Sequence, residues 1–137
     1  MRILIVDDSV LLRALYSRYL TRMGYETREA DQTDAEHMDW GRFDIVLLDV
    51  MMPRLSGYDL LRLASKSWSM QPRIFVYSVL TTRTAKQAFE DAGVDVYVTG
   101  YISKSIGMAK SLAFVEEAIG NPGRRAQHQS EQLVGTI

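Results

Sequence analysis

Short apolar runs alternate with longer amphipathic stretches along most of the chain. Three of these runs are rich in β-branched and aromatic residues and carry at most one charge each, at residues 3–6, 43–48 and 73–77. Runs so short and apolar are typical of strands that a parallel sheet buries on both faces. Two weaker strands are predicted as well, a mostly polar edge strand at residues 25–29 and a last strand that begins over residues 94–98.

The intervals between these strands show helical periodicity. Apolar residues recur at three- and four-residue steps over residues 12–23 and 57–68, and weaker helical patterns cover residues 31–40, 81–92 and 105–119. Strand and helix thus alternate through five repeats. Such alternation predicts an α/β fold in which helices cover both faces of a parallel sheet and the crossovers are right-handed.

Length and composition fit one domain with a proper core. The chain has 137 residues, of which 47% are apolar, and the helical pattern stops at the sequence Asn121-Pro122-Gly123. We therefore predict a domain at residues 1–120 and a polar tail or linker at residues 121–137.

Charge and residue content exclude several classes of function. The formal net charge of −1 provides no field that would attract nucleic acid or an anionic membrane. The lack of cysteine excludes thiolate metal sites and disulfides. No run approaches the roughly 20 apolar residues that a membrane span needs. We expect a cytoplasmic domain that binds neither nucleic acid directly nor a membrane.

Polar residues follow the predicted strands at the points where each strand ends. Asp7 and Asp8 follow the first strand, Asp49 follows the third, and Ser78 follows the fourth. In a fold of this kind the carboxyl ends of the strands form the functional edge of the sheet. Three carboxylates without a thiol or an imidazole form a hard oxygen site, which suits Mg²⁺ better than Zn²⁺. A bound cation would also explain how two adjacent carboxylates are tolerated.

The segments LIVDDS, IVLLDVMMPRLSGYDLL and DAGVDVYVT resemble the receiver domain of bacterial two-component response regulators. The resemblance covers residues 1–120 and implies a flavodoxin-like, doubly wound fold with five parallel strands in the order 2-1-3-4-5 and five helices. It also implies a signalling switch rather than an enzyme, since a receiver assists only its own phosphorylation.

The resemblance assigns a role to each acidic residue. Asp49 would be the phosphoacceptor, a carboxylate nucleophile that attacks the phosphoryl group of a phosphohistidine donor. Asp8 would bind Mg²⁺ directly, Asp7 mainly through water, and the backbone carbonyl of Met51 would be a further ligand. Ser78 would donate a hydrogen bond to a phosphoryl oxygen and take part in the switch.

The resemblance also implies partners. A histidine kinase or a phosphotransfer protein would supply the phosphoryl group, and a downstream effector protein or domain would bind through residues about 80–119. The resemblance also leaves a homodimer possible.

Among other functions, an aspartyl-phosphate phosphatase is disfavoured because Met51 occupies the place of its second aspartate. A flavin protein is disfavoured because the acidic pair repels an unescorted phosphate. A degenerate receiver that acts as a phosphorylation-independent docking module remains open.

The last strand departs from the family pattern. Family spacing places the expected lysine at Gly100 and the aromatic switch residue at Tyr97, but the next lysine is Lys104, four residues later. Tyr101 stands in the same relation to Lys104, and Ser105 replaces the usual proline. Either the lysine is lost and the domain tends towards a docking module, or four extra residues form one additional helical turn and Lys104 pairs with the phosphate. We favour Lys104 and leave the aromatic switch open between the two tyrosines.

Overall fold

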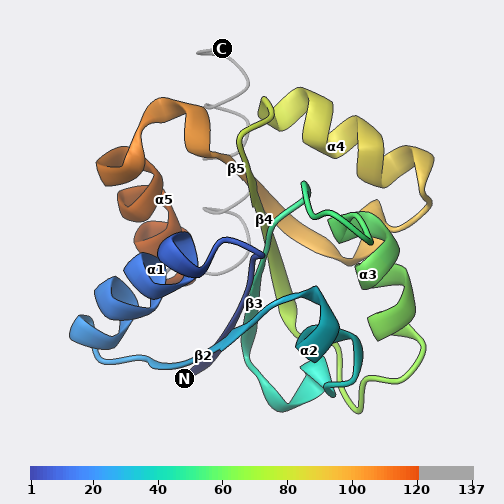
Figure 1. The fold of residues 1–137 in the computed structure, drawn as a ribbon, viewed down its shortest axis with the longest axis horizontal. Helices are drawn as coiled ribbons and strands as arrows, with labels where there is room; N and C mark the ends of the chain where they lie inside the picture. The colour runs from blue at the N-terminus through green and yellow to red at the C-terminus, as the bar shows by residue number, and fades with distance from the viewer. Residues whose placement is uncertain (121–137) are drawn as a thin grey trace.

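A five-stranded parallel sheet forms the centre of the structure, a computed structural model that describes residues 1–120 (Figure 1). The strands are β1 (Arg2–Val6), β2 (Glu26–Ala30), β3 (Ile45–Leu48), β4 (Arg73–Ser78) and β5 (Val98–Ser103). Their order in the sheet is β2-β1-β3-β4-β5. This order and the α/β class confirm the predicted doubly wound fold. The predicted polar tail, residues 121–137, lies outside the described residues.

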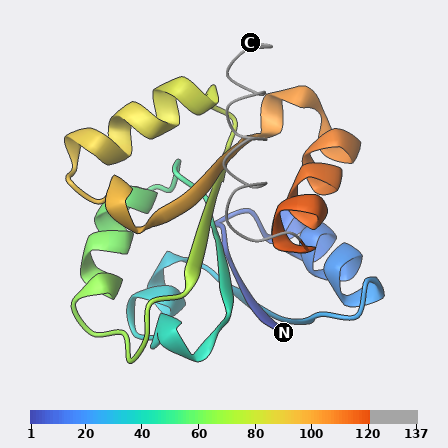
Figure 2. The same ribbon diagram turned by 180° about the vertical axis from the view of Figure 1, so that it is seen from behind.

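Five α-helices cover the two faces of the sheet. They are α1 (Val10–Arg22), α2 (Gln32–Glu36), α3 (Gly57–Ser65), α4 (Thr82–Asp91) and α5 (Met108–Gly120), with short 3₁₀ helices η1 (Trp40–Arg42), η2 (Asp95–Tyr97) and η3 (Lys104–Ile106). Figure 1 shows α1 and α5 on one side of the sheet and α2, α3 and α4 on the other, and Figure 2 shows the same layers from behind. Among residues 1–120, no helix is long and apolar enough to cross a membrane.

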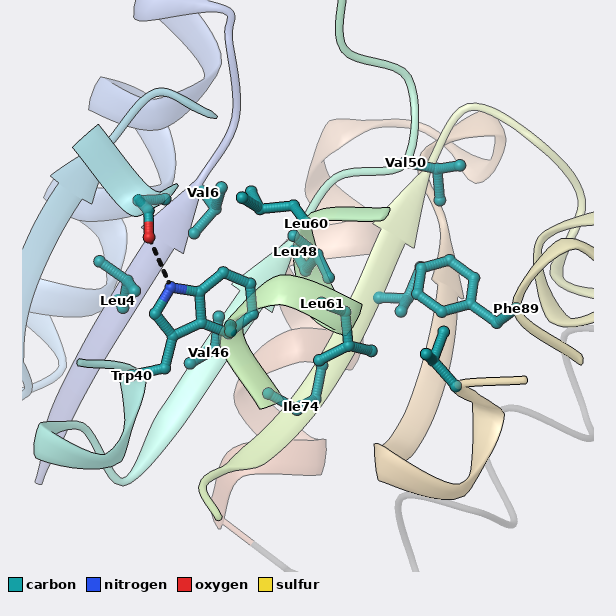
Figure 3. Packing of buried hydrophobic residues seen from close by; sticks show 14 of the residues in the cluster. Leu4, Val6, Trp40, Val46, Leu48, Val50, Leu60, Leu61, Ile74 and Phe89 are labelled. Carbon is teal, nitrogen blue, oxygen red and sulfur yellow. Dashed lines mark hydrogen bonds between the residues drawn. The ribbon is translucent and has the colours of Figure 1, made fainter. Parts of the chain in front are cut away.

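Each face of the sheet has its own hydrophobic core, because side chains alternate along a strand. On β1, Ile3 and Ile5 pack with α1 and α5, whereas Leu4 and Val6 pack with the other three helices. The second core contains Trp40, whose side chain is fully buried and whose Nε1 donates a hydrogen bond to the carbonyl of Ala35 over 3.0 Å (Figure 3). Burial on both faces explains why the central strands contain no polar alternation.

Side-chain caps explain where the helices begin. Ser9 accepts a hydrogen bond from the amide of Leu12 and so caps α1, while Ser56 and Thr81 cap α3 and α4 in the same way. The hydroxyl of Ser9 therefore does the capping, and the side chain of Asp8 is left for another role.

Helices α2, α3, α4 and α5 are shorter than the periodicity predicts, and α3 ends at Ser65 rather than at residue 68. The predicted helix at residues 31–40 is reduced to α2, and the predicted helix at residues 105–119 begins only at Met108. In the second case the residue before the helix is Gly107, with a φ angle of 97°, which no regular helix contains.

The last strand begins later than the sequence pattern predicts. The pattern places the start of the strand at residues 94–98, which is wrong, because Asp95–Tyr97 form η2 and β5 follows it. Residues 100–103 are buried beside β4, whereas the side chain of Val96 is 74% exposed. Pairing with β4 and burial of Tyr101 and Ile102 on opposite faces therefore decide which residues enter the sheet.

A further extra residue is absorbed inside β5. The pairing of β4 with β5 shifts in register between Ile74 and Phe75, which leaves Thr99 as an additional residue in the strand. Lys104 then follows the strand directly, as the first residue of η3. The prediction that the four extra residues before Lys104 form a helical turn is wrong, because residues 100–103 belong to β5.

Candidate functional site

The register of the sheet brings three polar side chains to one edge of the sheet, the acidic edge. Val6, Leu48 and Val76 lie level on β1, β3 and β4, so that the next residue on each strand is Asp7, Asp49 and Tyr77. All three side chains follow the alternation towards the face covered by α1 and α5. Asp7 is 2% exposed and Asp49 is 6% exposed, so both carboxylates lie largely out of water.

One ammonium group serves both buried carboxylates. The Nζ atom of Lys104 lies 3.0 Å from Oδ2 of Asp7 and 3.5 Å from Oδ1 of Asp49. It also lies 4.2 Å from the centre of the Tyr77 ring. Burying a charge is costly unless it is paired and hydrogen-bonded, so this shared cation makes the acidic edge tolerable in the absence of a metal.

The carboxylate of Asp7 is fully used by hydrogen-bond donors. Its Oδ1 accepts from the amide of Ser9 over 2.9 Å, and its Oδ2 accepts from the Tyr77 hydroxyl over 2.9 Å and from Lys104. The Asp7 backbone carbonyl accepts from Nη1 of Arg13 on α1 over 2.7 Å. Asp7 is therefore held in one orientation by groups from the β1–α1 loop, α1, β4 and η3.

Asp8 faces a different partner. Its two carboxylate oxygens accept from the amide and the Nε2 of Gln32 over 3.2 and 3.3 Å. The Oε1 of Gln32 in turn accepts from the amide of Leu55 over 2.6 Å. The structure thus brings Asp7, Asp49 and Lys104 together, whereas Asp8 is held towards the loop between β3 and α3.

Asp49 lies in a tightly packed turn. Its Oδ1 accepts from the amide of Val50 over 2.9 Å. Burial raises the pKa of Asp49 from 3.8 to about 6; Lys104 opposes this rise and the negative charge of Asp7 adds to it. A Cβ atom at Gly57 would lie 2.2 Å from the backbone oxygen of Asp49, so a side chain at position 57 would displace Asp49.

The outer rim of the site is apolar. The side chain of Met51 is 60% exposed, and with Leu80 and Tyr58 it lines an open cavity of about 450 Å³ between the β3–α3 loop and α4. The backbone carbonyl of Met51 belongs to the same loop as Asp49. The side chains of Met51 and Leu80, at the rim of this cavity, offer no hydrogen-bond donor to a water molecule.

Ser78 and the two candidate switch tyrosines occupy three different environments. Ser78 is 1% exposed, and its Oγ accepts from the amide of Leu80 over 3.1 Å. Tyr101 is 7% exposed on β5 and packs edge-on against Phe89 of α4, with ring centres 5.9 Å apart. Tyr97 precedes β5 and packs edge-on against Trp68 at 5.2 Å. Gly100, where family spacing puts the lysine, is buried within β5.

The donor atoms at this edge fit Mg²⁺ in their chemistry. Carboxylates and a backbone carbonyl are hard oxygen ligands, and Asp7 and Asp49 already share one cation. In residues 1–120, no three acidic or imidazole side chains converge as they stand closely enough to hold a metal. The two oxygens of Asp8 accept from Gln32 instead of sharing the cation of Asp7 and Asp49.

Sequence reasoning missed three residues that contact the acidic edge, namely Arg13, Gln32 and Tyr77. Tyr77 could have been found, because it ends its strand one residue before Ser78 and so shares a face with the end of β3. No local pattern indicates Gln32, because its contacts are with residues more than 20 positions away.

The fold, the acidic edge and the shared lysine together define a class of signalling domain. The family model described as "Response regulator receiver domain" matches residues 3–116. The chain therefore belongs to the response regulator receiver domain family, and the resemblance seen in the sequence is confirmed. Members of this family are signalling switches.

Known proteins are similar to this chain over most of its length. The chain is 31% identical over 101 residues to the gliding motility regulatory protein of Myxococcus xanthus. The aligned residues make up 72% of the chain but only 13% of that relative. It is 26% identical to the chemotaxis protein CheY4 of Vibrio cholerae, with a TM-score of 0.69 and coverage of 86% and 97% of the two chains. The response regulator TrrA of Thermotoga maritima, in complex with Mg²⁺ and BeF, shares the fold (TM-score 0.64, 24% identity, coverage of 84% and 96%).

Proposed function

We propose that the chain accepts a phosphoryl group on Asp49 in a Mg²⁺-dependent reaction and that this changes how it binds a partner. The observation that carries the proposal is the arrangement of Asp49, Asp7 and Lys104. A buried carboxylate that lies 3.5 Å from an ammonium group has both a nucleophilic oxygen and a nearby cation for the incoming charge. The family assignment supports the same reaction.

The reaction is a transfer from nitrogen to oxygen. A carboxylate oxygen of Asp49 attacks the phosphorus of a phosphohistidine, the P–N bond breaks, and the imidazole leaves with the bonding electron pair. The transition state of such transfers is loose, so positioning and charge neutralisation provide most of the catalysis. Lys104 supplies positive charge at the nucleophile, and the fixed amide of Val50 keeps the Asp49 carboxylate in one orientation.

The proposed metal ligands are Asp8, Asp49 and the backbone carbonyl of Met51, with Asp7 acting mainly through water. When bound, Mg²⁺ supplies charge neutralisation between these oxygens and the phosphoryl group. The Mg²⁺ in the TrrA complex supports this choice of ion. The three donors on Asp7, one of them the ammonium of Lys104, support an indirect role, because the contacts of Asp8 are two longer ones to the uncharged Gln32.

The proposed output is a change of surface over residues about 80–119. Phosphorylation replaces the single charge of the Asp49 carboxylate by the roughly two negative charges of an acyl phosphate, and the conformation that pairs best with those charges becomes favoured. Tyr101 is the better supported switch residue, because it is buried on β5 against α4, while Tyr97 lies before the strand on Trp68. The proposed partners are a histidine kinase or phosphotransfer protein as donor and an effector protein or domain as receiver of the signal.

The alternative, a phosphorylation-independent docking module, rests on Gly100 at the family position of the lysine. The position of Lys104 counts against it, because this lysine contacts both carboxylates that the reaction requires. A docking module would need such a cation only to neutralise the buried carboxylates, whereas a phosphoacceptor also needs it beside the incoming phosphoryl group.

Intact-protein mass spectrometry tests the proposal. Incubation with acetyl phosphate and Mg²⁺ should add the mass of one phosphoryl group, and both EDTA and Asp49→Asn should prevent the addition. Asp44→Asn, which changes a carboxylate at the opposite end of β3, is the matched control and should still be phosphorylated. A persistent adduct on the Asp49→Asn variant would show that another residue is the acceptor.

A further inference from the structure

We infer that Tyr77 is a positioning residue of the phosphoacceptor site, which holds Asp7 and Lys104 in the geometry that Asp49 requires. This inference rests on the proposed function and assigns a role to a residue that the acidic motif does not include. Tyr77 is fully buried at the end of β4, and its hydroxyl donates to Oδ2 of Asp7 over 2.9 Å.

The phenol contacts both partners of the central ion pair. Oδ2 of Asp7 accepts from Tyr77 and also from Lys104, over 2.9 and 3.0 Å. The same ammonium lies 4.2 Å from the centre of the Tyr77 ring. The ring face therefore borders the cation and the hydroxyl fixes the anion, so that one side chain restrains both.

Tyr77 is itself held by a second buried tyrosine. The ring of Tyr16 on α1 meets it edge-on, with centres 4.8 Å apart and planes at 65°. The hydroxyl of Tyr16 forms a 2.8 Å hydrogen bond with Oγ of Ser111 on α5. The position of Tyr77 is thus set by packing between two helices, which gives the hydroxyl a fixed direction towards Asp7.

The physical role follows from what the hydroxyl prevents. Without it, the Asp7 carboxylate would keep only the Ser9 amide on Oδ1 and Lys104 on Oδ2, so that it could turn about the Ser9 hydrogen bond towards the ammonium. Lys104 would then move nearer to Asp7 and farther from Asp49. Residues that hydrogen-bond to metal ligands without binding the metal themselves typically change metal affinity or activity by roughly 10- to 100-fold when they are removed.

Tyr77→Phe removes the hydroxyl and keeps the ring. The matched control is Tyr16→Phe, which also removes the hydroxyl of a buried tyrosine in the same aromatic pair but has its hydrogen bond to Ser111 rather than to Asp7. Both variants lose one buried hydrogen bond, so a loss of stability alone should affect them alike.

Three measurements distinguish a positioning role of Tyr77 from a purely structural role. The first is the Mg²⁺ dissociation constant, obtained from the amide chemical shifts of Ser9 and Val50, whose N–H groups donate to Asp7 and Asp49. The second is the rate of phosphorylation at saturating acetyl phosphate and Mg²⁺, and the third is the free energy of unfolding. We expect Tyr77→Phe to weaken Mg²⁺ binding and to slow phosphorylation by about 10-fold each. Tyr16→Phe should change each by less than about 2-fold.

A double-mutant cycle shows whether the effect passes through Asp7. If it does, Tyr77→Phe should have no further effect on Mg²⁺ affinity in the background of Asp7→Asn. An additive effect in that background, or a Tyr77→Phe variant that behaves like Tyr16→Phe, would overturn the inference. If the parent chain binds Mg²⁺ but gains no phosphoryl group, the proposed function fails, and the Mg²⁺ measurements still decide the role of Tyr77.

Discussion

The two halves of the acidic edge differ in what they contribute. Strands β1 and β3 are followed by carboxylates, Asp7 and Asp49. Strand β4 contains a hydrogen-bond donor near its end, Tyr77, and β5 is followed by another, Lys104. The anionic half cannot be buried alone, because unpaired carboxylates at 2% and 6% exposure would be strongly unfavourable. The site is therefore a property of the pairing of the two halves rather than of the acidic motif.

The halves also differ in how they are built. The β1–β3 pair runs in continuous register, and the amide of Asp49 donates to the carbonyl of Val6 over 3.0 Å. The β4–β5 pair carries a register irregularity, and the turn η2 precedes β5. Local sequence consequently positions the anions, while the position of the cation depends on how β5 aligns with its neighbour.

The largest expected effect comes from removing the cation of the donor half. Lys104→Met should lower the free energy of unfolding of the metal-free protein by about 3 kcal/mol, because breaking a buried pair leaves uncompensated charge. Urea unfolding measures the loss, and Lys110→Met, at an exposed lysine of α5, is the control. Equal losses in the two variants would mean that Lys104 does not stabilise the anionic half.

A second comparison distinguishes the two adjacent carboxylates. Asp8→Ala should weaken Mg²⁺ binding by about 100-fold, because the loss of a direct ligand should weaken binding at least as much as the loss of a residue that orients a ligand. Asp7→Ala should weaken it less, since Asp7 already accepts three hydrogen bonds and is expected to reach the ion through water. Calorimetric titration with Mg²⁺ measures both, and the reverse order would exchange their roles.

A third prediction concerns the pH dependence of the anionic half. Burial raises the pKa of Asp49 to about 6, so its contribution to the free energy of unfolding is fully present below about pH 4 and is lost as the pH rises through 6. In EDTA at pH 7, Asp49→Asn should therefore be more stable than the parent by about 1–3 kcal/mol. The difference should vanish near pH 4.

Chemical unfolding across this pH range measures that difference. Asp91→Asn, at an exposed aspartate of α4, is the control and should show no such dependence. A difference for Asp49→Asn that stays constant from pH 4 to pH 7 would mean that the carboxylate does not titrate there.

The smallest expected effect concerns the apolar rim outside both halves. Met51 and Leu80 offer no hydrogen bond to a hydrolytic water and partly shield the acyl phosphate. We expect slow self-dephosphorylation, which Met51→Asn should accelerate several-fold. A phosphate-release assay measures the rate. Met70→Asn is the control, because Met70 is an exposed methionine that does not line the rim cavity. Unchanged loss in the Met51 variant would assign the lifetime to other groups.

The sequence predicts the fold and the anionic half well because both depend on local patterns. Apolar runs define the strands, and the carboxylates follow those strands directly. The start of β5 is predicted wrongly because Val94 and Val96 look like strand residues, yet only residues that pair with β4 enter the sheet. The orientation of Asp8 towards Gln32 is equally non-local, since the first residue of α2 links the loop after β1 to the loop after β3.

The indole groups of the two tryptophans give the chain two separate optical reporters. Trp40 is fully buried in the core and bonded to Ala35, so its fluorescence should stay blue-shifted until the whole domain unfolds. Trp68 is only partly buried and packs against Tyr97 in the turn that leads into β5. Its emission should respond to any rearrangement of that turn. Trp40→Phe would leave Trp68 as the single tryptophan, beside the turn that leads into the least regular strand of the sheet.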